Sequence, residues 1–548
     1  MNTNNKYLPY IFLAVVAAIS VVLKLHVYTL GAPYVTIDDH TLYHAGFLVW
    51  FGEAPPQRVY LESWIVGLTS IATYVIKLIA TGNLDQLGLN LIADAYRDYI
   101  NSPEKYVLSY RAVMLTVDIA TAWLVFVFAK NLFRQQDQQY WLAAFTSALF
   151  LLSYNTLWCY LVARPDTVTT FFAMLGILFY YKSSFGEHKQ YLLMSAIFLG
   201  CATGMKLHAA LFVVFFIVDM IREIGFARAF KRIFYFGFVS FFIFLITAGS
   251  TLFDPLLYIK LRALNIKDDE SPWLQWGDQV ITQLEGTGWL LSPIVLVGTI
   301  YLLAQKKLTL PPQIKSVVLV SSIFILFFLS IRQLRGYWML PALPLIYASG
   351  IYLISRLNSK PIKHLFIVII GSIFTMQIYM QSKEFDNAQY DQLQQWVKNN
   401  AKPDDVIYIV GFDTLFLPCN TQCLQNRKLS LERNLQSALD QQENFTSRHV
   451  RLWEERVSLM QIDMLENQSD VGFNYYGING TPLHTLAPEI EYSDIKIVLA
   501  MQDYKTPESE ALLIKVKQDF TKIATANAPG GKAGTGGLPY DIYVRNTP

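Results

Sequence analysis

Residues 7–30 read YLPYIFLAVVAAISVVLKLHVYTL, and this apolar stretch matches the ~20 residues that an α-helix needs to cross a bilayer. It is longer than the 7–15-residue core of a cleavable signal peptide, and no small-residue cleavage site ends it. The stretch therefore predicts a membrane helix.

Similar apolar runs recur along the chain. Hydrophobic residues make up 53% of the 548 residues, and charged residues only 16%, against about 25% in soluble domains. We predict a polytopic α-helical membrane protein with about eleven transmembrane helices. The runs cover residues 7–30, 108–129, 140–158, 167–182, 190–204, 207–221, 233–252, 289–304, 316–331, 337–355 and 364–381.

The charge distribution divides the chain into two domains. Residues 1–382 carry 48 of the 86 charged side chains, whereas residues 383–548 carry 38 in less than half that length. The second part is therefore close to soluble proteins in charge density. Its apolar strand-like runs alternate with helical patterns, which predicts a soluble α/β domain over 383–548. The predicted strands are Val406–Val410, Ile495–Ala500 and Tyr540–Val544. Its acidic balance argues against a nucleic-acid partner.

Basic residues set the predicted orientation. If Trp64–Ala80 lies at the membrane surface, the tight basic clusters between later runs fall on the side of Lys6, which the positive-inside rule makes cytoplasmic. Residues 31–107 then form a large first external loop. The α/β domain also lies outside, in the periplasm if the membrane is a bacterial inner membrane.

The strongest candidate for chemistry follows the first run. Asp38, Asp39, His40 and His44 place two carboxylates and two imidazoles at the membrane surface, where ionisable groups indicate function. The alternative is structural, with an aspartate capping a helix over Thr41–Phe51.

Further charged residues are predicted on the same external face. Arg164 and Asp166 lie in a short turn, and Lys206 with His208, like Arg332 with Arg335, are cations that oppose the positive-inside bias. Cations of this kind bind phosphate, with Arg as a planar fork and Lys as a point charge. The alternatives are a helix cap at Asp166 and cations that extend to lipid headgroups.

Carboxylates and phosphate-binding cations together suit glycosyl transfer from a lipid-linked sugar phosphate. A carboxylate takes the acceptor's proton as the acceptor attacks the anomeric carbon. The cations offset charge on the departing polyprenyl phosphate.

The chain resembles the GT-C type membrane glycosyltransferases over residues 7–405. The branch it resembles contains the 4-amino-4-deoxy-L-arabinose lipid A transferase and the protein O-mannosyltransferases. The matching motifs are Asp38-Asp39, Arg164-Pro165-Asp166, Thr203-Gly204-Met205-Lys206, the segment from Arg335 to Pro344, and Gln394–Asn400 with Pro403-Asp404-Asp405.

This resemblance implies roles for the matching residues. Asp38 is expected to be the base, Asp39 and Asp166 its supporting or metal-contacting partners, and Lys206 and Arg335 phosphate ligands. Some members hold a divalent metal ion and others do not, so Asp39, His40 and His44 are candidate ligands. The expected partners are a polyprenyl-phosphate-linked sugar, the membrane and an envelope lipid, glycan or protein acceptor.

Two other functions compete with this reading. A transporter or flippase of lipid-linked sugar phosphates would use the same cations without chemistry, although no internal repeat is evident. A hydrolase or phosphotransferase in the tail would need a nucleophile with clustered metal ligands after residue 383. The two histidines there, His449 and His484, are far apart in the sequence and form no recognisable motif.

Overall fold

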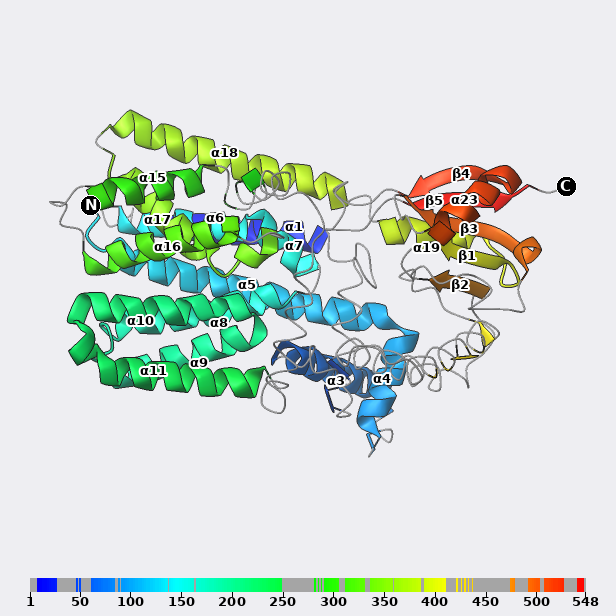
Figure 1. Cartoon of the computed structure of the whole chain (residues 1–548), viewed down its shortest axis with the longest axis horizontal. Helices are drawn as coiled ribbons and strands as arrows, with labels where there is room; N and C mark the ends of the chain where they lie inside the picture. Colours follow the sequence, from blue (N-terminus) through cyan, green and yellow to red (C-terminus); the bar gives the residue numbers. More distant parts are fainter. Residues whose placement is uncertain are drawn as a thin grey trace. The chain divides into compact units, whose positions relative to one another are not determined.

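The computed structural model describes most of the apolar part and the core of the tail (Figure 1). The described residues are 7–26, 46–47, 49–50, 61–83, 87–88, 90–136, 138–161, 164–248, 280–281, 284, 287, 290–304, 311–330, 336–357, 359–385, 389–410, 420–421, 425, 428–429, 432, 436, 474–478, 491–502, 507–526 and 540–546.

Two compact units make up the chain. The first, here called the helical unit, comprises residues 1–28, 56–65 and 110–381, and the second comprises residues 29–55, 66–109 and 382–548. Three described helices, α3 (Leu61–Thr81), α5 (Pro103–Leu132) and α18 (Lys360–Phe385), contribute residues to both. The division of the chain into a membrane domain and a soluble domain at residues 382/383 stays a prediction.

Each of the eleven predicted runs coincides with described helix. The helices are α1 (Leu8–His26), α5, α6 (Gln139–Leu151), α7 (Tyr154–Leu161), α8 (Pro165–Lys182), α9 (Lys189–Met205), α10 (Ala210–Ile224), α11 (Phe226–Thr247), α15 (Leu291–Ala304), α16 (Pro312–Ser330), α17 (Leu343–Ser355) and α18 (Lys360–Phe385). The run 140–158 forms two helices, because α6 ends at Leu151 and α7 begins after Ser153, whose Oγ accepts from the Thr156 amide (3.3 Å).

Within the described ranges, six helices are long and apolar enough to cross a membrane. They lie in α1, α3, α5, α11, α16 and α18. The total number of crossings stays a prediction. The helix α3 covers the segment that the sequence analysis places at the membrane surface, and its length and composition alone also allow a crossing.

Close glycine contacts hold α9 against α11. A Cβ atom at Gly200 would lie 2.7 Å from the Ser240 carbonyl oxygen and 2.7 Å from Ile243 Cβ. Gly200 and Gly204 are four residues apart, the spacing that lets membrane helices approach closely. This contact fixes the end of α9, which leads directly into Lys206.

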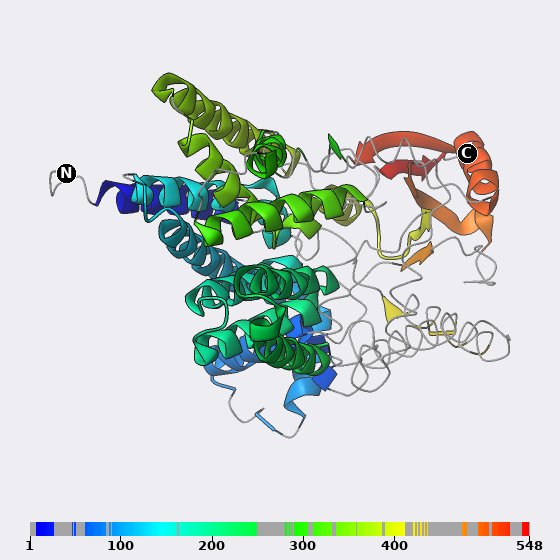
Figure 2. The same ribbon diagram turned by 60° about the vertical axis from the view of Figure 1, so that its left-hand side comes forward.

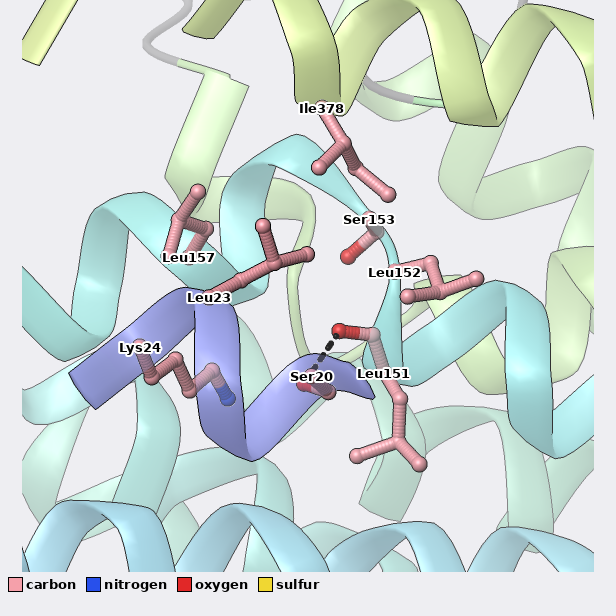
Figure 3. A pocket seen from close by; sticks show the side chains of 8 residues that line it. All are labelled: Ser20, Leu23, Lys24, Leu151, Leu152, Ser153, Leu157 and Ile378. Carbon is pink, nitrogen blue, oxygen red and sulfur yellow. Dashed lines mark hydrogen bonds between the residues drawn. The ribbon is translucent and has the colours of Figure 1, made fainter. Parts of the chain in front are cut away.

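A buried ion pair links α1 to α5. Lys24 Nζ lies 2.6 Å from Asp118 Oδ2, and both side chains are at most 1% exposed. Beside Lys24, Ser20 Oγ donates to the Leu151 carbonyl (3.2 Å) at the edge of a small cavity (Figure 3). The cavity measures about 10 Å³, room for one water molecule at most, so it is no substrate site.

In the second unit, α4 (Leu91–Asn101) is held between α3 and α5. Asp98 accepts a hydrogen bond from Lys77 on α3 and another from the Tyr106 hydroxyl on α5 (2.6 Å). The Tyr99 ring packs at a 5.6 Å centroid distance against Tyr106. These contacts order the described part of the predicted first external loop.

The tail forms a five-stranded mixed sheet in the order β2-β1-β3-β5-β4; Figure 1 labels its strands and Figure 2 shows them from another side. The strand β1 (Val406–Val410) pairs in parallel with the edge strand β2 (Asn474–Ile478) and with the central strand β3 (Ile495–Met501). The strand β5 (Tyr540–Arg545) is antiparallel to β3 and to β4 (Phe520–Ala526).

Helices cover both faces of this sheet. On one face, Leu393 and Val397 of α19 (Gln389–Asn400) pack on Ile407 and Ile409. On the other, Val516 of α23 (Pro507–Asp519) joins the cluster that contains Tyr408 and Val410. The alternation of strand residues between two cores confirms the predicted α/β fold.

We expect Gly200→Ala to lower the stability of the protein by about 1–3 kcal/mol, because the added methyl forces α9 and α11 apart. The matched control is Gly371→Ala on α18, where an added Cβ has nothing within 4 Å. Thermal unfolding midpoints in one detergent measure both. An unchanged or higher midpoint for Gly200→Ala would contradict the close contact.

Replacing one member of the α1–α5 ion pair should lower the stability of the protein more than replacing both members. Lys24→Met or Asp118→Leu alone leaves a buried charge, at a cost of roughly 3–5 kcal/mol, whereas the double variant restores most of the loss. Unfolding midpoints of the four proteins form a double-mutant cycle. Additive losses in the double variant would show that the two charges do not interact.

Candidate functional site

Asp166 lies buried in the first turn of α8. Arg164 precedes the helix in extended conformation, and Pro165 occupies its first position, where no backbone N–H is needed. The Asp166 side chain is fully buried, and its backbone carbonyl accepts from Thr170 Oγ1 (2.6 Å). The sequence Arg-Pro-Asp therefore starts a helix and fixes a carboxylate there.

Lys206 lies at the end of the neighbouring helix α9. Its backbone is extended, and its Nζ lies 3.4 Å from Asp166 Oδ2. The Lys206 side chain is 18% exposed, whereas Asp166 is 0% exposed. The cation is therefore the accessible member of the pair.

Glu62 is a further ionisable group that belongs to this site. It lies fully buried in the first turn of α3, and the Tyr110 hydroxyl of α5 donates to its Oε1 (2.6 Å). The charges of Asp166, Lys206 and Arg164 all act on Glu62. We call Glu62, Arg164, Asp166 and Lys206 the polar cluster.

Glu62 and Tyr110 are absent from the sequence-based candidates. A signal was present, because Glu62 opens an otherwise apolar run and an acid at membrane depth indicates function. Its partner, however, lies 48 residues further along the chain.

The buried carboxylates retain free acceptor capacity. Within the described part of the chain, neither side-chain oxygen of Asp166 accepts a hydrogen bond, nor does Glu62 Oε2. Buried polar atoms normally have such partners. These oxygens are therefore suited to receive a hydroxyl group or a cation from a ligand.

Basic residues gather at the other end of α8, where α10, α11 and α16 also have an end. Tyr180 near the end of α8 donates to Asp219 Oδ2 of α10 (3.1 Å), as does Ser316 at the start of α16 (2.8 Å). Arg232 of α11 donates to the Phe185 carbonyl after α8 (3.1 Å). These contacts bring the helix ends together, and we call this region the basic end. Its described basic residues are Lys182, Lys189, Arg222, Arg228, Lys231, Arg232 and Lys315.

The length of α8 separates the polar cluster from the basic end. The helix has 18 residues, which span ~27 Å, close to the ~30 Å of a bilayer's hydrocarbon core. The two ends of the helical unit therefore suit opposite faces of a membrane.

Among the predicted site residues, the structure brings together Arg164, Asp166 and Lys206. Their roles stay predictions. His208 is also described, with its ring near Phe328 (centroid distance 6.0 Å). The remaining predicted residues lie outside the described residues; they are Asp38, Asp39, His40, His44, Arg332 and Arg335.

A metal centre is not evident in the part of the chain that the structure describes. No group of three or more His, Cys, Asp or Glu side chains there is arranged to hold a metal ion. The predicted ligands Asp39, His40 and His44 lie outside that part, so the metal stays a prediction.

Two solved structures are similar to this chain. One is ArnT from Cupriavidus metallidurans bound to undecaprenyl phosphate, with 10% identity over 97% of each chain and a TM-score of 0.49. The other is the same protein in the apo state, with the same identity and coverage and a TM-score of 0.43. No family model and no curated protein matches this sequence.

ArnT is the lipid A 4-amino-4-deoxy-L-arabinose transferase, a GT-C glycosyltransferase. It belongs to the branch of enzymes that the sequence motifs resemble. Residue roles do not carry over at this identity.

Removing the Tyr110 hydroxyl should destabilise the site. Tyr110→Phe leaves Glu62 Oε1 buried without its donor, at a cost of about 1–3 kcal/mol, measured as a lower unfolding midpoint. Tyr301→Phe is the control, because Tyr301 is 54% exposed on α15. Equal midpoints for Tyr110→Phe and the control would contradict the buried hydrogen bond.

Proposed function

We propose that this chain is an integral membrane glycosyltransferase that moves a sugar from a polyprenyl-phosphate donor to an envelope lipid, glycan or protein. The observation that carries the proposal is the Asp166–Lys206 pair, in which a buried carboxylate holds a partly exposed cation. A cation held in this way, next to carboxylates with open acceptor positions, suits a phosphate-linked sugar.

The proposed reaction takes place on the external face. The basic end carries the residues that membrane proteins retain in the cytoplasm, and the polar cluster lies at the other end of α8. We therefore assign the cluster to the outside of a bacterial inner membrane, and we propose from the predicted topology that the α/β tail is also outside. Nucleotide sugars are generally absent there, which favours a lipid-linked donor.

One bond breaks and one forms in this reaction. The acceptor oxygen attacks the anomeric carbon, the bond from that carbon to the phosphate oxygen breaks, and polyprenyl phosphate leaves with the electron pair. The acceptor's proton passes to a carboxylate, for which we propose Asp38. Asp39 is proposed to support it.

The cations hold and neutralise the phosphate. Lys206 is the described candidate, and Arg164, Arg332 and Arg335 are proposed to add to it. Because Asp166 is fully buried beneath Lys206, we assign it the positioning of that cation. A divalent metal ion on Asp39, His40 and His44, when bound, would offset phosphate charge in the same way.

Transfer assays test the proposal. Purified protein is given a panel of radiolabelled polyprenyl-phosphate sugars with a membrane extract as acceptor. We expect Asp38→Asn to lower kcat about 10²–10⁴-fold, as the loss of a general base does. We expect Lys206→Met mainly to raise the KM for the donor, because the cation contacts its phosphate.

The control is Lys517→Met, because Lys517 is exposed on α23 and should leave both constants unchanged. Undiminished transfer by Asp38→Asn would move the base to another carboxylate. A wild type that binds donors but transfers no sugar would overturn the enzyme assignment in favour of the transporter.

A further inference from the structure

One face of α11 carries a ladder of exposed phenylalanine rings. Four of them recur at every fourth residue and are 56–67% exposed; they are Phe226, Phe230, Phe234 and Phe238. The Phe234 and Phe238 rings stack at a centroid distance of 6.1 Å. Ala229, Phe236 and Ser240 are buried on the opposite face, where α11 packs on α9.

Two cations at the start of α11 are available to a ligand. Arg228 and Lys231 are exposed and form no ion pair within the described part of the chain. Their neighbours differ, because Arg222 pairs with Asp219 (2.9 Å) and Arg232 donates to the Phe185 carbonyl (3.1 Å). Arg222 and Arg232 therefore hold the basic end together, whereas Arg228 and Lys231 do not.

Lys231 lies on the same helix face as Phe234 and Phe238, and Arg228 precedes Lys231 by three residues, which makes the two cations neighbours on the helix surface. Phe234 and Phe238 follow Lys231 by three and seven residues, spacings that return to the same side of an α-helix. Seven residues rise ~10 Å along the axis. Two cations with two further rings below them, Phe234 and Phe238, complement an anionic head with a hydrocarbon chain.

The combination of two cations and exposed rings indicates which class of ligand fits this face of α11. A soluble phosphate would contact the cations and leave the rings unused. A neutral phospholipid would pack on the rings and gain little from two positive charges. An anionic phospholipid uses both features at once, and basic residues near a membrane surface attract such lipids.

We propose that α11 binds one anionic phospholipid of the leaflet at the basic end. Its phosphate lies at Arg228 and Lys231, and an acyl chain follows Phe234 and Phe238. This site is separate from the polar cluster and does not depend on the proposed transfer reaction.

Native mass spectrometry of the full-length protein tests this site. The protein is purified in detergent and titrated with phosphatidylglycerol or with phosphatidylcholine of identical acyl chains. We expect stronger retention of phosphatidylglycerol. Arg228→Gln/Lys231→Gln should weaken that retention on the order of tenfold and leave phosphatidylcholine unchanged.

Two further variants make the test specific. Phe234→Ala/Phe238→Ala should also weaken phosphatidylglycerol retention, because the acyl chain loses its contacts. Lys515→Gln/Lys517→Gln removes two exposed charges from α23 and should change nothing. All variants should match the wild type in monodispersity on size exclusion, because the changed side chains are exposed.

Three outcomes would overturn the proposal. The first is equal retention of the two lipids by the wild type. The second is unchanged phosphatidylglycerol retention in Arg228→Gln/Lys231→Gln. The third is full displacement of the lipid by millimolar glycerol 3-phosphate, which would show that the headgroup anion alone is bound.

Discussion

An ionisable group among apolar helices has no water to solvate it, and the helical unit depends on pairing such groups. Lys24 with Asp118 joins α1 to α5, Asp219 with Arg222 anchors the basic end, and Lys206 with Asp166 joins α9 to α8. For the sealed Lys24–Asp118 pair, the attraction offsets a desolvation cost of several kcal/mol per ion. The differences in exposure separate their roles: the Lys24–Asp118 pair is sealed, whereas Lys206 still reaches solvent.

Much of the fold follows from the sequence because hydrophobic length and periodicity are local properties. The apolar runs became helices, and β1, β3 and β5 appeared at the predicted positions. The missed strands β2 and β4 are the two edges of the sheet. An edge strand is covered less, and β4 accordingly buries only its terminal residues Phe520 and Ala526, so its apolar pattern is weak.

The candidate site was predictable only in part. Short motifs contain Arg164, Asp166 and Lys206. Their charges stand out from the apolar residues around them, so each could be found from its own segment of sequence. Glu62 needed knowledge of the helix that packs against it, because a buried carboxylate is understood only with its donor Tyr110. Such pairings come from tertiary contacts, which one sequence does not record.

The neighbouring helices α8 and α9 run antiparallel and meet at the polar cluster (Figure 1). Asp166 therefore lies at a helix N-terminus, which is partially positive, and Lys206 at a helix C-terminus, which is partially negative. The backbone alone thus prescribes the sign of each side chain. Exchanging the aspartate and the lysine would preserve the charge count yet place each ion against the wrong pole, so the polarity of the site is inherent in the chain direction.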